Sequence, residues 1–473
     1  MLASASAFLA LAVVPAAAQA GDAGVVRAQR TLYPAAERAA QRATTAEGFQ
    51  ASYDAARDLQ EALRAAAPLS PRCATLRAAL DRYAAGRVLE MEGVDRPSPG
   101  DRVAGRRAAE GARAIVAARA GRCAGGAAGL AVAPLAMSPA SGEVFFGSVV
   151  ARAPEGATAA ELTVDDGFAG RAAVTGGRVR FGVTVAPGPH ELRIAFTAGA
   201  GVTRVLRATG AVLLPESARA RPVAARTNAA LSRRLAGALS EGPRFRAAWV
   251  HDLVDGRSAG VGADLAFPAA STVKLGLMAE VLSRLGAAPE RSAWAYDLRT
   301  MAGWSSNLAT NRLLRRFGGA SAAAAGLRRL GARASTFPGE YIVGTAVGPP
   351  AVSRRVTTAR DLGRMLLSLH SAAAGVPGAV RATGLTVHQA RLGIGWLAAS
   401  EQRGDNAGLF AGGVAPGTAI AQKNGWIRAA RLGAAIVYRP RGPAIVVVTT
   451  YDETGVPLAR AQALGARVAA LLR

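Results

Sequence analysis

The chain reads FPAASTVKLGL from Phe267 to Leu277, and apolar residues continue from there to Leu285. This pattern predicts a helix that begins at Ser271. Ser271 and Lys274 are three residues apart, so a helix places both side chains on one face, where the amine can accept the serine proton. The alternative is a serine N-cap followed, one turn later, by a solvated lysine.

Lysine is almost missing from this sequence. Lys and Arg together number 57, yet Lys274 and Lys423 are the only lysines. A compositional drift towards arginine explains the bias. It spares positions that need an amine, because a desolvated lysine can lose its proton and fits where a planar guanidinium does not. Both lysines are therefore candidate functional residues, and chance survival is the alternative.

Two later segments carry polar side chains that fit the same chemistry. In the segment from Trp304 to Leu314, Ser305 and Asn307 present a hydroxyl and an amide together. The alternative for this pair is a polar helix cap.

The second segment is Gln422-Lys423-Asn424-Gly425-Trp426, which precedes a strand-like stretch, residues 432–438. A buried amine at a strand edge is suited to bind a carboxylate. Gly425 lets the backbone approach a ligand closely, and the N–H group of Trp426 can join that of Ser271 around an oxyanion. A solvated lysine in a hairpin turn is the alternative.

Taken in order, S-x-x-K at Ser271, S-x-N at Ser305 and K-x-G at Lys423 resemble the active-site triplet of the serine β-lactamases and penicillin-binding proteins. The resemblance is to the class A β-lactamase-like group and covers residues 226–473. Residues 305–314 are similar to its S-D-N-x-A-A-N-L-L-L segment, and residues 356–362 resemble its T-T-P-R-D-M helix entry. The resemblance implies an α+β fold of the β-lactamase/transpeptidase type.

The resemblance also implies catalytic roles. Ser271 would be the nucleophile, Lys274 a base that assists acylation, and Ser305 a proton relay towards the leaving nitrogen. Class A enzymes hydrolyse the acyl-enzyme with a glutamate of an E-x-x-L-N loop, and Glu340 lies at the corresponding place without the L-N part. Glu340 is thus the candidate water-activating base. The alternative is a solvated loop glutamate, in which case the acyl-enzyme persists.

Substrate-binding roles are implied in the same way. Asn307 would hydrogen-bond the amide side chain of the substrate, and Lys423 would hold its carboxylate next to Gly425 and Trp426. Two residues depart from the family pattern. Ser306 replaces the aspartate of S-D-N, and Asn424 replaces the threonine of K-T-G. An asparagine amide can still donate there, so Asn424 bears on substrate preference more than on the chemistry.

The rest of the chain indicates an exported, multidomain protein. Residues 1–20 resemble a secretory signal peptide with an Ala-x-Ala cleavage site, although the usual positive n-region is missing and the segment could instead stay as an anchor. Residues 25–124 have helical spacing, and residues 141–213 alternate with period two, which suggests an immunoglobulin-like β-sandwich. The domain of residues 226–473 follows. No later run is long and uncharged enough to span a membrane.

Cys73 and Cys123 are the only cysteines. In an exported protein an even count favours one disulfide, and two buried free thiols are the alternative. The four histidines are scattered without a metal-binding spacing, so neither a metal nor another cofactor is expected. The net charge of +25 comes from arginines spread along the chain, and the aromatic content is only 5%, which disfavours nucleic-acid binding. Such a charge would attract anionic cell-wall polymers.

The sequence therefore predicts an exported serine hydrolase that opens β-lactam amides through an acyl-serine intermediate. The first alternative is a penicillin-binding or peptidase-like enzyme that acts on wall peptides or esters and deacylates slowly. The second is a non-hydrolytic wall-binding protein with a decayed site.

Overall fold

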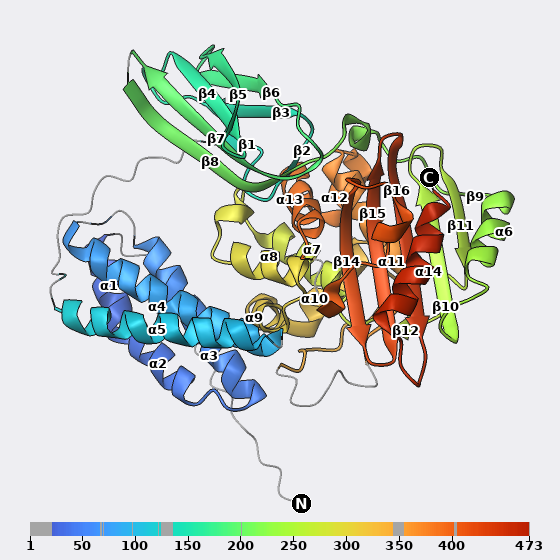
Figure 1. Cartoon of the computed structure of the whole chain (residues 1–473), viewed down its shortest axis with the longest axis horizontal. Coiled ribbons are helices and arrows are strands. Elements are labelled where there is room, and N and C mark those ends of the chain that lie inside the picture. Colours follow the sequence, from blue (N-terminus) through green and yellow to red (C-terminus); the bar gives the residue numbers. More distant parts are fainter. Residues whose placement is uncertain are drawn as a thin grey trace, which may run out of the picture. The chain divides into compact units, whose positions relative to one another are not determined.

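A computed structural model describes residues 21–66, 69, 71–96, 98–121, 123, 136–199, 201–343, 354–401 and 404–472. The predicted signal peptide, residues 1–20, lies outside the described residues. The chain divides into two compact units, residues 1–133 and residues 134–473 (Figure 1). None of the described helices is both long enough and apolar enough to cross a membrane.

The first unit is helical, as the spacing of its apolar residues predicts. Its elements are α1 (Asp22–Arg27), η1 (Ala28–Leu32), α2 (Tyr33–Gln41), α3 (Ala46–Ala65), α4 (Pro71–Asp95) and α5 (Pro99–Arg119). Thr45 caps α3 by accepting a hydrogen bond from the Gly48 N–H, and Ser98 caps α5 in the same way.

A disulfide joins Cys73 of α4 to Cys123, whose Cα atoms are 4.8 Å apart. Both cysteines are buried in the same hydrophobic cluster as Leu59, Leu80 and Val116, which come from α3, α4 and α5. This finding confirms the predicted disulfide and excludes the alternative of two free thiols.

The second unit begins with strands that form two sheets. They are β1 (Met137–Ser138), β2 (Val144–Phe145), β3 (Ser148–Arg152), β4 (Ala159–Val164), β5 (Gly167–Ala173), β6 (Arg178–Gly182), β7 (Gly188–Ala198) and β8 (Gly201–Leu213). One sheet has the order β1-β3-β6, and the other has the order β2-β8-β7-β4-β5. Alternate residues such as Val179 and Phe181 of β6 are buried in a core that both sheets share.

The remainder of the second unit has an α+β architecture. A six-stranded sheet has the order β14-β15-β16-β10-β11-β9. Its strands are β9 (Arg226–Thr227), β10 (Phe245–Asp252), β11 (Arg257–Val261), β14 (Ala419–Ile427), β15 (Ala430–Arg439) and β16 (Gly442–Tyr451). Strands from the beginning and the end of this part thus pair in one sheet, and the α+β fold that the resemblance implies is confirmed for this part.

Helices fill the middle of this part and its end. They are α6 (Ala229–Ala238), α7 (Lys274–Arg284), α8 (Ala295–Gly303), α9 (Asn307–Phe317), α10 (Gly319–Arg329), α11 (Ala359–Ala373), α12 (Pro377–Thr383), α13 (Val387–Ala398) and α14 (Leu458–Ala470). Two further short strands, β12 (Phe267–Pro268) and β13 (Val356–Thr357), pair with each other.

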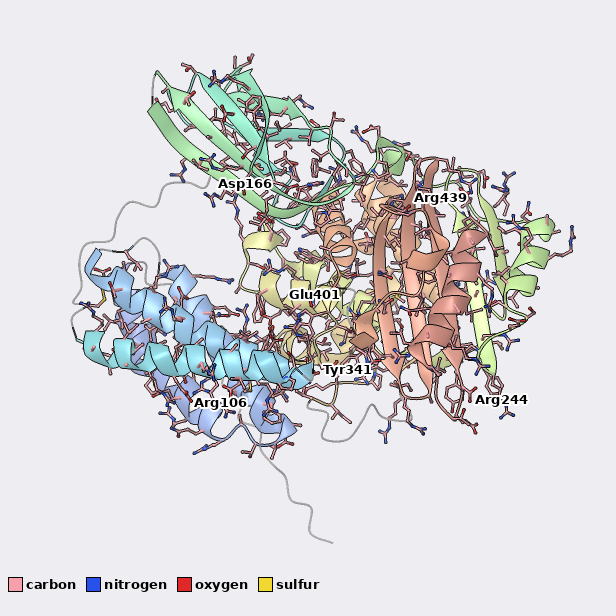
Figure 2. All side chains as sticks on the ribbon, viewed as in Figure 1. Arg106, Asp166, Arg244, Tyr341, Glu401 and Arg439 are labelled. Carbon is pink, nitrogen blue, oxygen red and sulfur yellow. A yellow bond between two sulfur atoms is a disulfide. The ribbon has the colours of Figure 1, made fainter. Side chains whose placement is uncertain are left out.

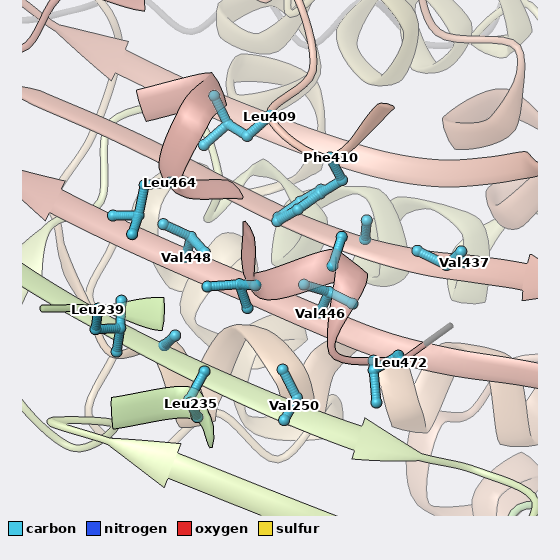
Figure 3. Close-up of a cluster of buried hydrophobic side chains, with 14 of the residues drawn as sticks. Leu235, Leu239, Val250, Leu409, Phe410, Val437, Val446, Val448, Leu464 and Leu472 are labelled. Atoms are coloured by element: carbon cyan, nitrogen blue, oxygen red, sulfur yellow. The ribbon is translucent and has the colours of Figure 1, made fainter. Parts of the chain in front are cut away.

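Helices cover both faces of the six-stranded sheet. On one face, Leu235 of α6 and Leu464 of α14 pack against Val446 and Val448 of β16 (Figure 3). On the other face, α11 lies so close to β10 that a Cβ atom on Gly363 would collide with the indole ring of Trp249. The sheet is therefore enclosed, and strands such as β16 are almost continuously apolar.

Helix α7 is the central helix of the helical layer. All of its residues from Lys274 to Leu282 are buried. They include two charged side chains, Lys274 and Glu280, and Glu280 is paired with Arg284 and Arg329. It crosses α10 where Gly326 faces Gly276, and a Cβ on Gly326 would collide with the Gly276 carbonyl oxygen. This close crossing fixes the position of the turn that precedes α7, which carries Ser271.

Candidate active site

Ser271 lies in a tight turn directly before α7. The helix begins at Lys274, three residues later than the sequence predicts, because the preceding turn is closed by bonds of the 3₁₀ type, such as that from the Lys274 N–H to the Ser271 carbonyl at 3.2 Å. The Thr272 hydroxyl donates to the Ala269 carbonyl at 2.7 Å. Ala270 has a φ of 46°, a left-handed conformation that is uncommon for a residue with a Cβ atom and is concentrated at functional sites.

Lys274 is the buried amine next to this turn, with an exposed fraction of 1%. Its Nζ atom donates to the Ser305 carbonyl at 2.6 Å and to the Asn307 Oδ1 atom at 2.8 Å. It also lies 3.4 Å from the Ser305 Oγ atom. The structure therefore brings the S-x-x-K and S-x-N segments together through this one ammonium or amine group.

Ser305 is held in an unusual backbone conformation, with a φ of 72°. The next residue, Ser306, caps α9 by accepting a hydrogen bond from the Ala309 N–H at 3.1 Å. The helix cap thus uses the serine that replaces the aspartate of S-D-N, while Ser305 directs both its carbonyl and its hydroxyl towards Lys274. The left-handed φ at Ser305 is the second such strained position at this site, after Ala270.

Lys423 reaches the same hydroxyl from the other side. It lies on β14, is 2% exposed, and its Nζ atom donates to the Ser305 Oγ atom at 2.9 Å and to the Asn424 carbonyl at 3.0 Å. Burial lowers the pKa of Lys423 to about 7, because a desolvated ammonium loses hydration that the neutral amine does not need. The two lysines of the chain, 149 residues apart in the sequence, thus meet at one serine hydroxyl.

Gly425 brings β14 against the turn that carries Ser271. A Cβ atom at this position would lie 2.9 Å from the Ala269 carbonyl oxygen and 3.0 Å from the Ser271 nitrogen. The next strand residue, Trp426, pairs with Arg431 of β15. β14 is an edge strand of the sheet, so a ligand can approach the backbone of this strand beside Ser271.

Asn424 and Asn307 are engaged by neighbouring backbone groups. The Asn424 amide nitrogen donates to the Asn406 carbonyl at 2.8 Å. The Asn307 amide nitrogen donates to the Ile342 carbonyl at 3.2 Å, while its oxygen accepts from Lys274. Asn307 therefore links Lys274 to the segment that contains Glu340.

Glu340 forms an ion pair on the outer side of that segment. Its carboxylate accepts hydrogen bonds from the Arg315 guanidinium at 2.6 and 2.7 Å, and its side chain is 41% exposed. Its carbonyl oxygen accepts a hydrogen bond from Arg355 at 2.7 Å. The structure therefore places the Glu340 carboxylate with Arg315.

The neighbouring residue, Tyr341, which is labelled in Figure 2, contacts the turn before α7 and Lys274 instead. Its hydroxyl donates to the carbonyl of Ala270, the residue before Ser271, at 2.9 Å. The Lys274 Nζ atom lies 4.2 Å from the centre of its ring. Burial raises the pKa of Tyr341 far above its usual range, so the phenol stays protonated. The sequence analysis missed Tyr341, and the only available signal was a tyrosine beside Glu340 in a chain with few aromatic residues.

Asn311 is a second residue that the motifs did not single out for its contacts. Its amide oxygen accepts from the Tyr341 N–H at 2.8 Å, and its amide nitrogen donates to the Tyr341 carbonyl at 2.8 Å. This two-point contact from α9 fixes the backbone at Tyr341.

Within the described ranges, one group of side chains has the composition and spacing of a metal site, and it consists of Asp22, Cys73 and Cys123. Both sulfur atoms are already joined in the disulfide, so this group does not offer thiolate ligands.

Comparisons with known proteins concern the half of the chain that holds these groups. A sequence model described as "Beta-lactamase enzyme family" matches residues 230–291 and 295–473. Among solved structures, PBP-A is 18% identical, with a TM-score of 0.43, and the match covers 53% of this chain and 97% of that one. A β-lactamase from Streptomyces albus G is 23% identical, with a TM-score of 0.42 and coverages of 52% and 98%. A β-lactamase from Desulfarculus baarsii is 20% identical, with a TM-score of 0.41 and coverages of 51% and 96%. A search of curated sequences found no match.

Proposed function

The chain belongs to the β-lactamase enzyme family, and from this premise we propose that residues 226–473 form a serine acyl-transfer enzyme that opens β-lactam amides through an acyl-Ser271 intermediate. The observation that carries the proposal is the meeting of three motifs at one hydroxyl. The Ser305 Oγ atom lies 2.9 Å from the Lys423 Nζ atom and 3.4 Å from the Lys274 Nζ atom, beside the turn that carries Ser271.

In the proposed acylation, the Ser271 oxygen attacks the amide carbonyl carbon and its proton passes to the Lys274 amine. The C–N bond of the amide then breaks, and the leaving nitrogen receives a proton through the Ser305 hydroxyl. The N–H groups of Ser271 and Trp426 stabilise the oxyanion, and removal of one such donor typically lowers the rate about 100- to 1000-fold. The close approach of Gly425 to the Ser271 nitrogen supports this pairing of donors.

Substrate binding is assigned to two residues. Lys423 would hold the carboxylate of the substrate. In the contacts described, its buried amine donates to the Ser305 hydroxyl and the Asn424 carbonyl, which are both uncharged oxygens. A substrate carboxylate would supply the opposite charge. Asn307 would turn its amide nitrogen from the Ile342 carbonyl to the amide side chain of the substrate. Asn424 would tune substrate preference only if its amide leaves the Asn406 carbonyl.

For deacylation, we propose that Glu340 does not activate water. Its carboxylate is bound by Arg315 at 2.6 and 2.7 Å, and a charge-assisted pair of this kind holds the carboxylate in place. The acyl-enzyme would then persist. This observation favours the second candidate function, a penicillin-binding or peptidase-like enzyme that acts on wall peptides or esters with slow release of the acyl group.

The same proposal extends to the N-terminal parts of the chain and to its export. We propose that residues 141–213 form an immunoglobulin-like sandwich, which the sheet orders β1-β3-β6 and β2-β8-β7-β4-β5 support. We further propose that the protein is exported, with residues 1–20 as a signal peptide. The disulfide supports an oxidising compartment, and the net charge of +25 supports attraction to anionic wall polymers.

A labelling experiment tests this function. The full chain, Ser271→Ala and a control, Ser240→Ala at an exposed serine, are incubated with a fluorescent penicillin and a chromogenic cephalosporin. We expect a stable label on the wild type and the control, and no label on Ser271→Ala. Rapid turnover of the cephalosporin would identify a true β-lactamase. No label and no turnover would reject the enzyme function for these substrates and favour a wall-binding protein with a decayed site.

The same experiment decides the role of Glu340. We expect the acyl-enzyme of Glu340→Gln to have a lifetime within about twofold of the wild type, because the carboxylate is committed to Arg315. A lifetime about 100 times longer would instead identify Glu340 as the base, since general-base catalysis contributes roughly that much.

A further inference from the structure

Tyr341 is fixed beside the nucleophile by contacts on every part of the residue. Its backbone is held by the Asn311 amide, with two hydrogen bonds of 2.8 Å. Its hydroxyl is held by the Ala270 carbonyl at 2.9 Å. Its ring packs edge-on against Phe337, with the ring centres 5.7 Å apart. A tyrosine with these restraints cannot swing away from Ser271 without breaking several contacts at once.

Two basic side chains lie over the ring of Tyr341. The Lys274 Nζ atom is 4.2 Å from the ring centre, and the central guanidinium carbon of Arg355 is 3.6 Å from it. Arg355 is in turn tied to the backbone of the same segment through the Gly339 carbonyl at 2.6 Å. Cation–π attraction between the Arg355 guanidinium and the ring adds to the fixation of the ring. The ring therefore occupies the space next to the Lys274 amine, on the side of the 339–342 segment.

We propose that Tyr341 shields the acyl-Ser271 ester from water and so sets the lifetime of the acyl-enzyme. The proposal rests on the proposed function, because it requires that Ser271 is acylated. A hydrolytic water must reach both the ester carbon and a group that accepts its proton. The aromatic ring fills the place beside Lys274 from which a water could do both, and the protonated phenol is no base.

Without the ring, the acyl-Ser271 ester can be hydrolysed in the following steps. Water enters beside Lys274, its oxygen forms a bond to the acyl carbon, and one of its protons passes to the Lys274 amine. The ester bond to the Ser271 oxygen then breaks, and that oxygen takes a proton back from the Lys274 ammonium. The products are the free acid and the free enzyme, so no further reactant is needed.

Acyl-enzyme lifetimes test the proposal. The full chain, Tyr341→Phe and Tyr341→Ala are labelled with fluorescent penicillin, freed from excess reagent, and followed as the label is lost. We expect Tyr341→Phe to retain a lifetime within about twofold of the wild type, because the ring remains. We expect Tyr341→Ala to lose its label at least 10 times faster, while its rate of acylation changes less. A merely structural role would instead lower acylation without shortening the lifetime.

Several outcomes would overturn the proposal. A lifetime of Tyr341→Ala equal to that of the wild type would refute shielding, and an equally short lifetime of Tyr341→Phe would assign the effect to the hydroxyl. Tyr451→Ala, a tyrosine at the end of β16, controls for the loss of an aromatic ring elsewhere and should leave the lifetime unchanged. If the wild type is not labelled at all, the proposed function fails, which is a different result from a labelled protein with an insensitive lifetime.

A second measurement does not depend on the folding of a variant. Hydroxylamine is added to the labelled wild type in its native and denatured states. We expect the native ester to release its label at least 10 times more slowly than the denatured one. Equal rates would show that the ester is open to small nucleophiles and would overturn the shielding.

Discussion

Lys423 has a charge that depends on pH within the working range of an enzyme. Burial lowers its pKa to about 7, so the amine is protonated below that pH and neutral above it. Only the protonated form attracts a carboxylate strongly. We therefore expect the second-order rate constant of acylation by penicillin to fall as the pH rises through about 7, to the extent that Lys423 controls binding.

The variants Lys423→Arg and Lys423→Ala separate this charge from other titrating groups. Arginine stays protonated at all relevant pH values, so Lys423→Arg should acylate more slowly but should not lose rate above pH 7 through this group. Lys423→Ala should acylate about 10- to 100-fold more slowly, as expected for the loss of a charged hydrogen bond. A wild-type decline that survives unchanged in Lys423→Arg would assign the titration to another residue.

At the residue scale, the sequence identified candidate residues that the structure brings together, but it could not predict the orientation of the loop beside them. Ser271, Lys274, Ser305 and Lys423 were singled out because each belongs to a short motif, and the three motifs in order resemble a family triplet. The side-chain directions of Glu340 and Tyr341 depend on Arg315 and Asn311. These two partners lie 25 and 30 residues earlier, on α9. No local pattern encodes which of two adjacent side chains turns inward.

At the element scale, β14 lies directly against the turn that carries Ser271, because residue 425 is a glycine. A Cβ atom at Gly425 would lie 2.9 Å from the Ala269 oxygen and 3.0 Å from the Ser271 nitrogen. Both of these neighbours are backbone atoms, which cannot rotate away as a flexible side chain can. A side chain at this position must therefore push the strand and the turn that carries Ser271 apart.

We expect Gly425→Ala to lower the acylation rate at least 100-fold, because a displacement of about 1 Å is enough to disrupt a catalytic arrangement. The fold should survive, since only the edge strand moves. Stopped-flow labelling measures the rate, and thermal unfolding checks the fold. Gly286→Ala is the matched control, because a Cβ atom there meets nothing within 4 Å. Near-normal acylation by Gly425→Ala would show that this close contact is not needed.

The elements themselves were predictable where their apolar pattern is long. The period of two along β6 and the helical spacing of α3 both lead to the observed structures. The start of α7 was predicted three residues too early, because a tight turn of the 3₁₀ type has no distinct apolar pattern. Such a turn depends on local hydrogen bonds, among them that of the Thr272 hydroxyl to the Ala269 carbonyl.

At the scale of the whole molecule, the chain consists of two units with separate hydrophobic cores. The disulfide between Cys73 and Cys123 belongs entirely to the first unit, and the reactive groups belong entirely to the second. The change from helical to alternating spacing along the sequence indicated distinct parts. It could not show that the two sheets and the part that carries Ser271 form one unit, because packing between neighbouring parts leaves no period in the sequence.

Reduction of the disulfide should therefore affect one unit alone. The bridge spans 50 residues, and in the chain-entropy model a loop of this size stabilises the folded state by roughly 4 kcal/mol. Calorimetry of the full chain should show two unfolding transitions. A reductant should lower the transition temperature of only one of them, and the double variant Cys73→Ala and Cys123→Ala should have the same effect. Penicillin labelling of Ser271 should persist in both cases. A reductant that abolished labelling would show that the catalytic unit depends on the helical one.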